Sequence, residues 1–284
     1  MSKDKVAIVV DGTAYLPEDL IQKYNMHVIP LLVNWGGESL RDNVDITADQ
    51  FYARLQTEKE MPTTSQPSPG DFLEIYKKAA ETADSIVCVT ISSELSGTYA
   101  SAIAARDMMD GFPIEVVDSK STIMGLGFIT LAAAEAIAAG ADHKEAAAKA
   151  SALVPRMRLL FVVDTLEFLH RGGRIGGASR FVGTLLSIKP ILTLADGKVE
   201  PLDKVRTRKK ALAKMLSIAE NDLRGQTNFR IAVQNAAAPA DGSKIANEVK
   251  KKFGLTDVIQ SDISPVIGTH VGPGSIAVVY YIEP

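Results

Sequence analysis

The sequence predicts an α/β protein of two domains. Short apolar runs alternate with helical segments through the first half of the chain, and the order of elements changes near residue 155. The length of 284 residues also reaches the size at which a single core stops growing. We therefore expect residues 1–155 to form a Rossmann-like N-terminal domain around a parallel sheet, and residues 156–284 a C-terminal domain around a mixed sheet.

Four apolar runs predict the strands of the N-terminal domain, at residues 6–10, 27–33, 85–91 and 114–119. Pro30 within the second run predicts an edge position or a bulge, because proline cannot donate to a strand ladder. Residues 35–42 resemble a hairpin or an irregular excursion. Helices are expected after Pro17, after Thr47 with Gln50 completing a capping box, and at 71–82, 99–106, 124–139 and 142–154.

A different order of elements predicts the C-terminal domain. Its helices are expected at 207–223 and 241–253, and its strands at 159–163, within 185–194, and at 198–201, 230–234, 257–260 and 275–281. Asp196-Gly197 between two apolar runs is a strong hairpin signal. A hairpin combined with strand–helix units predicts a sheet with both antiparallel and parallel pairs.

The composition predicts a soluble cytoplasmic protein. Apolar residues make up 46% of the chain, charged residues 23%, and the net charge of −3 gives no general electrostatic case for binding nucleic acid. Cys88 is the single cysteine and lies in an apolar run, which favours a core residue over a nucleophile. No signal-peptide pattern precedes the first strand, and we interpret the apolar segment 124–141 as a core helix.

The stretch 91–102 is the centre of the candidate site. A buried run ends in Ser-Ser-Glu-Leu-Ser-Gly-Thr, and a helix then begins. The first N–H groups of a helix lack internal partners and favour negative charge, the hydroxyls of Ser96 and Thr98 add donors, and Gly97 allows close approach. The pattern fits an anion site. An ordinary N-cap explains the same residues, since Ser and Thr are common there.

Polar groups follow three of the predicted parallel strands. Asp11 follows the first, the turn 92–98 follows the third, and Asp118 follows the fourth. Ligands of such sheets bind at the carboxyl ends of the strands. We therefore expect these groups at one edge of the N-terminal sheet.

Residues 61–70 combine three prolines with four hydroxyl side chains. Such a segment cannot be a helix interior or a central strand, so we expect a stiff loop. It is either a plain connector or a preorganised polar clamp.

Two further stretches carry candidate binding groups. The segment Gly172–Gly177 lacks the Lys-Ser/Thr of a phosphate loop, so we interpret it as a close-approach backbone that presents Arg171 and Arg174 to an anion. His270 lies in the glycine-rich stretch 266–274, which we expect to be a loop. There it is either a hydrogen-bond donor to an anion or a surface histidine.

The sequence gives weaker signals for enzyme chemistry. No His-x-x-x-His or Cys-x-x-Cys spacing occurs, so we expect no metal site. Ser96, His270 and Asp118 could form a triad, but Gly-x-Ser-x-Gly is absent and Ser96 precedes a helix in a Leu-Ser-Gly-Thr turn. The alternatives that stay open are a serine-dependent esterase or acyl-phosphate hydrolase using Ser96 and His270, and a pure interaction protein.

Five motifs taken together resemble the DegV family of bacterial fatty-acid-binding proteins, which serve fatty acid kinase. In chain order they are Asp11-Gly12-Thr13-Ala14, Thr63-Thr64-Ser65-Gln66-Pro67, Ser92-Ser93-Glu94-Leu95-Ser96-Gly97-Thr98-Tyr99, Leu169-His170-Arg171-Gly172-Gly173-Arg174-Ile175 and Gly268-Thr269-His270-Val271-Gly272-Pro273-Gly274. They span essentially the whole chain. The departures are Gly12, where many members have Ser, and His170-Arg171, which replaces a frequent Lys pair.

The resemblance implies a two-domain α/β protein that buries one long-chain fatty acid in an internal tunnel, with the carboxylate between the domains. Carried over motif by motif, Thr64 and Ser96 hydrogen-bond the carboxylate, the backbone at Gly97 assists, and His270 donates from the second domain. Two arginines match family positions associated with docking the kinase, Arg174 and Arg206.

The implied function is a carrier and not an enzyme, with no cofactor besides its bound fatty acid. It presents the carboxylate to an ATP-dependent fatty acid kinase and then holds the acyl-phosphate for phospholipid synthesis, with transient membrane contact for lipid exchange. A buried carboxylate needs hydrogen bonds, which the hydroxyls and the imidazole supply. A tail of about sixteen methylenes, at roughly 0.8 kcal/mol each, would supply most of the affinity.

Overall fold

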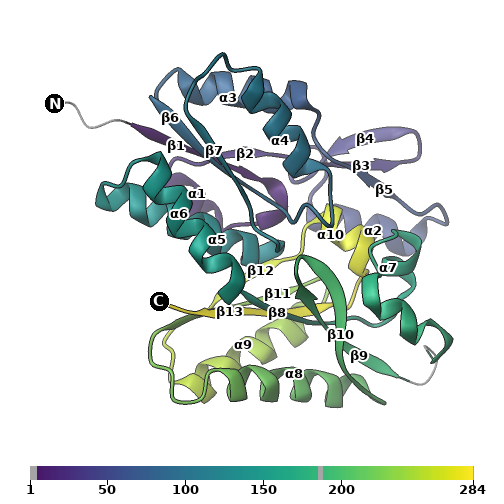
Figure 1. The fold of residues 1–284 in the computed structure, drawn as a ribbon. Coiled ribbons are helices and arrows are strands. Elements are labelled where there is room, and N and C mark those ends of the chain that lie inside the picture. Colours follow the sequence, from purple (N-terminus) through teal and green to yellow (C-terminus); the bar gives the residue numbers. More distant parts are fainter. Residues whose placement is uncertain (1–4, 185–187, 284) are drawn as a thin grey trace.

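The computed structural model describes residues 5–184 and 188–283 (Figure 1). Residues 1–4 and 284 lie outside this part, as do 185–187, with which the expected apolar run 185–194 begins. The fold is α/β, as predicted, with one sheet built from the first half of the chain, another from the second half and a small third sheet beside them. No helix in the described ranges has the length and apolarity needed to cross a membrane.

The N-terminal sheet is parallel throughout. Its strand order is β2-β1-β6-β7, formed by His27–Ile29, Val6–Asp11, Ser85–Thr90 and Ile114–Asp118. Every residue of β6 is buried, as expected for a central strand covered on both faces. Burial raises the pKa of the Cys88 thiol on this strand to about 12, so it stays protonated at neutral pH. This confirms the prediction that Cys88 is a core residue.

Helices cover both faces of this sheet (Figure 1). On one face lie α3 (Pro69–Ala80) and α4 (Thr98–Asp107), which contact β1 and β6. On the other face lie α5 (Ile123–Ala139) and α6 (His143–Leu153), and α1 (Glu18–Lys23) connects β1 to β2. This three-layer arrangement confirms the Rossmann-like N-terminal unit.

The segment between β2 and α3 forms the small antiparallel sheet. Its order is β4-β3-β5, formed by Glu38–Arg41, Leu32–Trp35 and Thr63–Ser65. The run predicted at 27–33 therefore splits at Pro30 into β2 and β3. Helix α2 (Ala48–Thr57) begins with the predicted capping box of Thr47 and Gln50.

The prediction of a stiff loop over residues 61–70 was wrong for residues 63–65 and 69–70. Residues 63–65 form the edge strand β5, which pairs with Leu32–Asn34 of β3. The prolines at 62 and 67 flank this strand, so the residues between them keep the N–H groups that a ladder needs. Helix α3 begins at Pro69, earlier than expected, because Ser68 and Asp71 form a capping box.

The C-terminal sheet is mixed, as predicted. Its order is β10-β9-β8-β13-β11-β12, formed by Lys198–Val205, Lys189–Ala195, Arg158–Val162, Ile276–Ile282, Phe229–Asn235 and Ile259–Asp262. Among the described strands of this C-terminal sheet, β11 and β12 form the only parallel pair. The β9–β10 hairpin turns at Asp196 and Gly197, with φ values of 48° and 82°, as a primed turn requires.

The two faces of the C-terminal sheet bury different neighbours. Consecutive residues of β13 point to opposite faces. Val278 packs in the cluster under α8 (Arg208–Asp222) and α9 (Pro239–Phe253), while Val279 packs in the larger cluster with α5. Helix α5 thus contacts both main sheets. The predicted domain boundary after residue 155 falls in the short turn Val154–Arg156 between α6 and β8, and the division into 1–155 and 156–284 stays a prediction.

Asp11 links the carboxyl ends of two neighbouring strands. Its carboxylate is fully buried and accepts hydrogen bonds from the Thr13 N–H at 2.9 Å, from the Thr13 hydroxyl, and from the Ile91 N–H. Burial raises the pKa of Asp11 to about 6. Asp118, at the end of β7, accepts the Ser93 N–H at 3.1 Å. Asp11 thus fixes Ile91, immediately before the turn 92–98, and Asp118 fixes Ser93 within it, which confirms that these groups share one sheet edge.

We expect Asp11→Asn to lower the free energy of unfolding by about 1–3 kcal/mol at neutral pH, because the amide NH₂ cannot accept all of these bonds and one buried N–H is left unpaired. Urea denaturation of both proteins measures this. Asp45→Asn is the control, since Asp45 is an exposed carboxylate whose side-chain bonds, among the described residues, reach only Arg41 at the end of β4, and we expect a much smaller change there. Equal effects of the two changes would contradict the role of Asp11.

The contributions of Asp11 and Asp45 to stability should depend on pH in opposite directions. The raised pKa of Asp11 means that the folded state binds its proton more tightly, so this contribution to stability is complete below about pH 4 and is lost as the pH rises through about 6. The pKa of Asp45 is lowered to about 2 by its hydrogen bonds with Arg41, so its contribution is lost as the pH falls. The stability gap between the wild type and Asp11→Asn should therefore narrow from pH 4 to pH 7.

Candidate functional site

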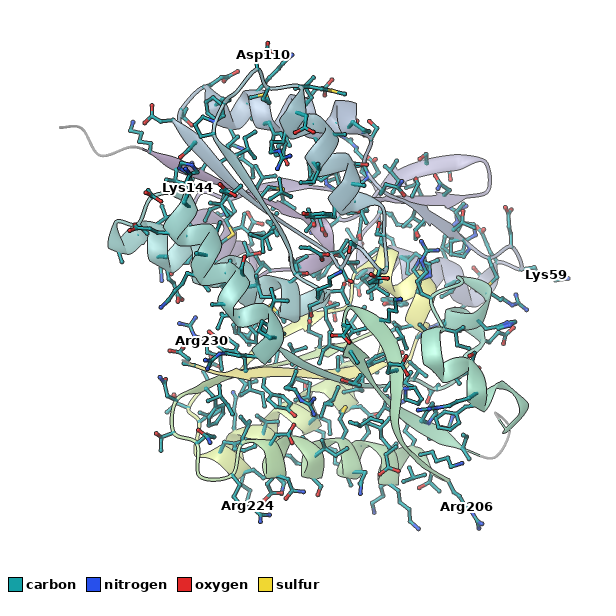
Figure 2. All side chains as sticks on the ribbon, in the orientation of Figure 1. Lys59, Asp110, Lys144, Arg206, Arg224 and Arg230 are labelled. Atoms are coloured by element: carbon teal, nitrogen blue, oxygen red, sulfur yellow. The ribbon has the colours of Figure 1, made fainter. Side chains whose placement is uncertain are left out.

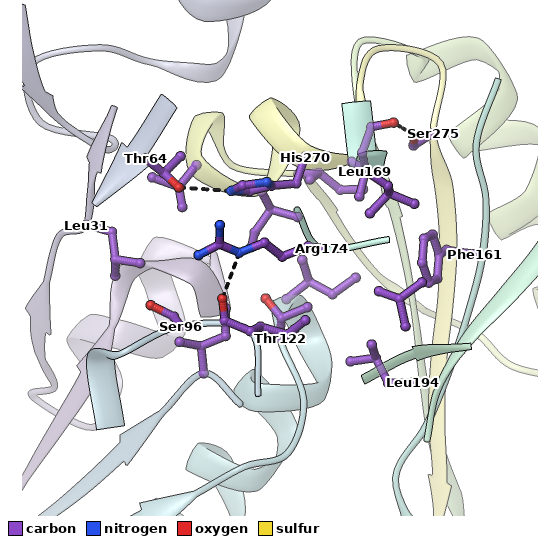
Figure 3. A pocket seen from close by; sticks show the side chains of 18 of the residues that line it. Leu31, Thr64, Ser96, Thr122, Phe161, Leu169, Arg174, Leu194, His270 and Ser275 are labelled. Carbon is purple, nitrogen blue, oxygen red and sulfur yellow. Dashed lines mark hydrogen bonds between the residues drawn. The ribbon is translucent and has the colours of Figure 1, made fainter. Parts of the chain in front are cut away.

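A cavity lies between the carboxyl edge of the N-terminal sheet and the inner face of the C-terminal sheet (Figure 3). About 810 Å³ of space that no protein atom fills lies within its bounds, open solvent included. Most of its wall is apolar, and these side chains come from both halves of the chain: Leu31, Ile91, Leu95, Ile123, Leu159, Phe161, Leu169, Leu194, Val199, Ile263, Val266, Ile267, Val271 and Ala277.

Several polar side chains gather at one end of the cavity, whereas Ser275 lies toward the other end, where its hydroxyl donates to the Val271 carbonyl at 2.9 Å. Figure 3 shows Thr64, His270, Arg174 and Ser96 near one another, while Phe161 and Leu194 lie toward the other end. The apolar end is the inner face of the C-terminal sheet, where alternation along the strands places apolar side chains. The cavity therefore has the polarity of an amphiphile, with a polar head at one end and an apolar tail at the other.

His270 lies on a helix, and the expectation of a glycine-rich loop was wrong. Helix α10 (Pro265–Val271) begins with Pro265 at its first turn and with Ser264 as N-cap, and it ends at Gly272 with a φ of 73°. Position 268, inside this helix, is glycine because a Cβ there would be 2.4 Å from the Tyr52 hydroxyl. In this segment glycine permits close packing, which the sequence pattern does not distinguish from loop flexibility.

The N-terminal half holds α10 in place. The Asp42 carboxylate accepts the Val266 N–H at 3.2 Å, and the Tyr52 hydroxyl donates to the Ile263 carbonyl at 3.0 Å. At the other end of the helix, His270 Nε2 shares a hydrogen bond with Thr64 Oγ1 at 2.9 Å. The side chains of Thr64 on β5 and His270 on α10 thus meet although 206 residues separate them.

His270 is neutral at neutral pH. Burial lowers its pKa to about 4, and the nearby positive charge of Arg174 acts in the same direction. Its second ring nitrogen, Nδ1, is buried without a hydrogen-bond partner among the described residues. That nitrogen lies against Gly172, where a Cβ would be 2.1 Å away. Glycine at this position therefore leaves the space that the imidazole occupies.

Arg174 is the cationic group of the cavity. It follows α7 (Glu167–Arg171), and its guanidinium donates to the Leu95 carbonyl at 3.0 Å and to the Gly172 carbonyl at 2.8 Å. The sequence associated Arg174 with docking of a partner, whereas the structure places it in the cavity wall. A guanidinium at the polar end favours an anionic head group.

Ser96 lines the cavity just before α4. Its hydroxyl shares a hydrogen bond with the Thr98 hydroxyl at 2.8 Å and accepts the Thr98 N–H at 3.3 Å. Gly97 is the N-cap residue of α4 and offers no side-chain cap. A Cβ at Gly97 would be 2.9 Å from Gln66 Nε2, so glycine at this position leaves room for the Gln66 side chain. Of the predicted ligand residues, Thr64, Ser96 and His270 line the cavity, and Gly97 adjoins it.

Arg206 lies far from these groups. It is exposed after the end of β10, and Figure 2 shows its side chain pointing away from the molecule. It takes no part in the cavity.

Sequence reasoning missed two cavity residues at the start of α5. Thr122 and Ile123 both line the cavity, and Ile123 has a φ of 46°, which a β-branched residue rarely adopts. The only signal was the hydroxyl-rich turn Ser119–Thr122 after a strand, which resembles an ordinary helix cap.

The arrangement does not form a nucleophilic triad. Ser96 bonds Thr98, His270 bonds Thr64, and the Asp118 carboxylate accepts from the Ser93 and Lys120 N–H groups. No hydrogen bond joins Ser96 to His270 in the described structure. The chemistry that this site offers is binding of an anion by hydroxyls, an imidazole and a guanidinium.

This chain belongs to the DegV family, because the family model matches residues 5–283. A DegV domain-containing protein of Streptomyces coelicolor is 42% identical over 277 residues, covering 96% of this chain and 97% of its own length. Protein DegV of Bacillus subtilis is 34% identical over 274 residues, covering 96% and 98%. The predicted family membership is confirmed.

Solved structures of the family share the whole fold. The structure of a DegV family protein from Thermus thermophilus, described as binding fatty acid, has a TM-score of 0.93 at 35% identity, covering 98% of this chain and 100% of that one. DegV from Bacillus subtilis, described as a fatty acid binding protein, has a TM-score of 0.92 at 32% identity, covering 99% and 100%. A stearic-acid-binding protein from Eubacterium ventriosum has a TM-score of 0.89 at 27% identity, covering 98% of each chain.

We expect Gly172→Ala to displace the His270 imidazole, because the new Cβ would overlap Nδ1. The pKa of His270 should then move from about 4 toward its ordinary value of 6.5 as the ring leaves its buried position. An NMR titration of the imidazole Cε1–H resonance measures this shift.

Gly173→Ala is the matched control. No atom lies within 4 Å of a Cβ there, although the φ of 69° adds conformational strain. It should reduce stability slightly and leave the His270 titration unchanged. An unaltered His270 titration in Gly172→Ala would contradict the packing described above.

Proposed function

We propose that this protein binds one long-chain fatty acid in the cavity and is a carrier without catalytic activity or cofactor. The observation that carries this proposal is the cavity between the two main sheets, which has an apolar wall and a polar end formed by Thr64, Ser96, His270 and Arg174. Membership of a family whose solved members are described as binding fatty acids supports the same ligand class.

The head group is held at the polar end. The carboxylate accepts hydrogen bonds from the hydroxyls of Thr64 and Ser96, from the backbone at Gly97 and from His270 Nε2. Arg174 supplies the positive charge that a buried carboxylate requires. Because Thr64 and His270 already share a hydrogen bond, the ligand inserts into a preorganised donor pair. A nearby carboxylate also raises the pKa of His270, so binding of the anion favours proton uptake by the imidazole.

The tail extends along the inner face of the C-terminal sheet. At about 0.8 kcal/mol per buried methylene, even a fraction of a sixteen-carbon chain exceeds the contribution of the head group. The affinity therefore depends mainly on the apolar wall, and the polar end orients the chain.

A carboxylate bound at the polar end of the cavity suits transfer chemistry performed by a partner. We propose that an ATP-dependent fatty acid kinase phosphorylates the carboxylate and that this protein then carries the acyl-phosphate for phospholipid synthesis in the cytoplasm, with transient membrane contact for lipid exchange. Arg206, exposed and distant from the cavity, is the proposed docking residue. Arg174 contributes to docking only through its position in the cavity wall.

Native mass spectrometry of the purified protein tests the carrier proposal. We expect a mass excess of one C14–C18 fatty acid, which lipid extraction identifies. Thr64→Val, Ser96→Ala and His270→Phe should each weaken binding of added hexadecanoic acid by about tenfold, since each removes one hydrogen bond to a charged group. A purified protein that stays free of fatty acid even after incubation would overturn the proposal.

The hydrolase alternative has a separate readout. Wild-type protein should release no product from a p-nitrophenyl ester or from acetyl phosphate, and Ser96→Ala should not change that result. Turnover by the wild type that is lost in Ser96→Ala would favour the hydrolase, in spite of the hydrogen bonds that hold Ser96 and His270 apart.

Docking is tested by Arg206→Glu in a kinase-coupled phosphorylation assay with a fatty acid kinase. We expect about a tenfold loss in kcat/KM, mainly through KM, with fatty acid binding unchanged. Arg224→Glu is the matched control, because Arg224 is also an exposed arginine of the C-terminal half and lies elsewhere on the surface (Figure 2). Equal losses in the two variants would refute a specific role for Arg206.

A further inference from the structure

The start of α5 places an unused hydroxyl in the cavity wall. Thr122 is 8% exposed and lines the cavity (Figure 3). Its Oγ1 is buried and has no hydrogen-bond partner among the residues that the structure describes. A buried hydroxyl without a partner is destabilising, because it has lost water and gained nothing in exchange. The cavity is the place from which a partner can come.

Thr122 differs from the other threonines that begin helices here. Thr47 and Thr207 each accept an N–H of the helix that follows them. In α5 the corresponding N–H, that of Gly125, donates to the Thr122 backbone carbonyl at 3.0 Å, and Gln234 Oε1 on β11 accepts the Met124 N–H at 2.7 Å. The first turn of α5 therefore does not need the Thr122 hydroxyl. This leaves that hydroxyl available to a molecule in the cavity.

The neighbours of Thr122 fix where along a ligand it acts. The Ser121 carbonyl accepts the Ser92 N–H at 2.8 Å, which holds Thr122 beside the turn that carries Ser96. Figure 3 shows Thr122 between Ser96, at the polar end, and Leu194, on the apolar wall. A fatty acid whose carboxylate is held at the polar end thus passes Thr122 with its first carbons. The Thr122 hydroxyl is therefore next to carbons that are methylenes in an unsubstituted fatty acid and cannot hydrogen-bond to it.

We propose that the cavity selects fatty acids that carry an oxygen substituent close to the carboxylate, namely 2- or 3-hydroxy acids, and that Thr122 Oγ1 hydrogen-bonds this oxygen. The proposal rests on the proposed function and narrows its substrate class. The N-terminal end of the seventeen-residue helix α5 favours an electron-rich atom at the same position. The apolar wall beyond Thr122 holds the rest of the chain as it would hold an unsubstituted one.

Equilibrium binding to the delipidated protein tests this substrate class. Hexadecanoic, 2-hydroxyhexadecanoic and 3-hydroxyhexadecanoic acids compete against a fluorescent fatty acid on the wild type, Thr122→Val and Thr122→Ser. We expect the wild type to prefer one hydroxy acid over the plain acid. The ratio of the two affinities should fall about tenfold in Thr122→Val, which keeps the shape and removes the hydroxyl, and should persist in Thr122→Ser.

A second readout reports on the unliganded protein. Because Thr122→Val removes a buried hydroxyl without a partner, its melting temperature without ligand should equal that of the wild type or exceed it by about 1–3 °C. A clear decrease would mean that the hydroxyl has a structural partner, and this would overturn the proposal.

Two binding results would also overturn it. An unchanged affinity ratio in Thr122→Val shows that the hydroxyl does not contact the substituent. An equal weakening of all three acids shows that Thr122 binds the carboxylate itself. Thr64→Val keeps these results apart from the proposed function, because it should weaken all three acids alike. If none of the three acids binds to the wild type, the carrier function itself fails.

Discussion

The hydrogen bond between Thr64 and His270 is the contact on which the polar end of the cavity depends. It joins the edge strand β5 to α10. Burial and the adjacent Arg174 both lower the pKa of His270, so the imidazole in this bond is neutral across the physiological range. Gly172 leaves the space in which the ring fits. The two halves of the chain thus meet at the His270 imidazole, which is uncharged without ligand and lies beside the cationic Arg174.

The periodic elements could be predicted from the sequence because their signals are local. The buried run at β6, the capping box at Thr47 and the Asp196-Gly197 turn each follow from neighbouring residues alone. The edge strand β5 was missed because a three-residue strand between prolines has no period to detect. Helix α10 was missed because Gly268 is required by the Tyr52 side chain, which is remote in sequence.

The candidate site divides in the same way. The resemblance to the DegV family predicted Thr64, Ser96 and His270 as binding residues, and all three line the cavity, while their binding role stays a prediction. The sequence predicted that Arg174 faces an anion, but its place in the cavity wall could not be inferred, because it depends on carbonyl groups from two separate turns. Thr122 was invisible for a related reason. Whether its hydroxyl is needed at the start of α5 depends on the other acceptors there, among them Gln234, which lies 110 positions away in the sequence and accepts the Met124 N–H.

The position of α5 between the two main sheets has a consequence for how the molecule unfolds. Its apolar residues belong to one cluster that also contains Phe161, Val279 and Tyr281 of the C-terminal sheet. Removing either half would expose an apolar surface that only the other half covers. The chain should therefore lose its structure as one cooperative unit, and a protease that cuts near residue 155 should release no stable fragment. Although the chain is organised around two sheets, in thermodynamic terms it is a single body.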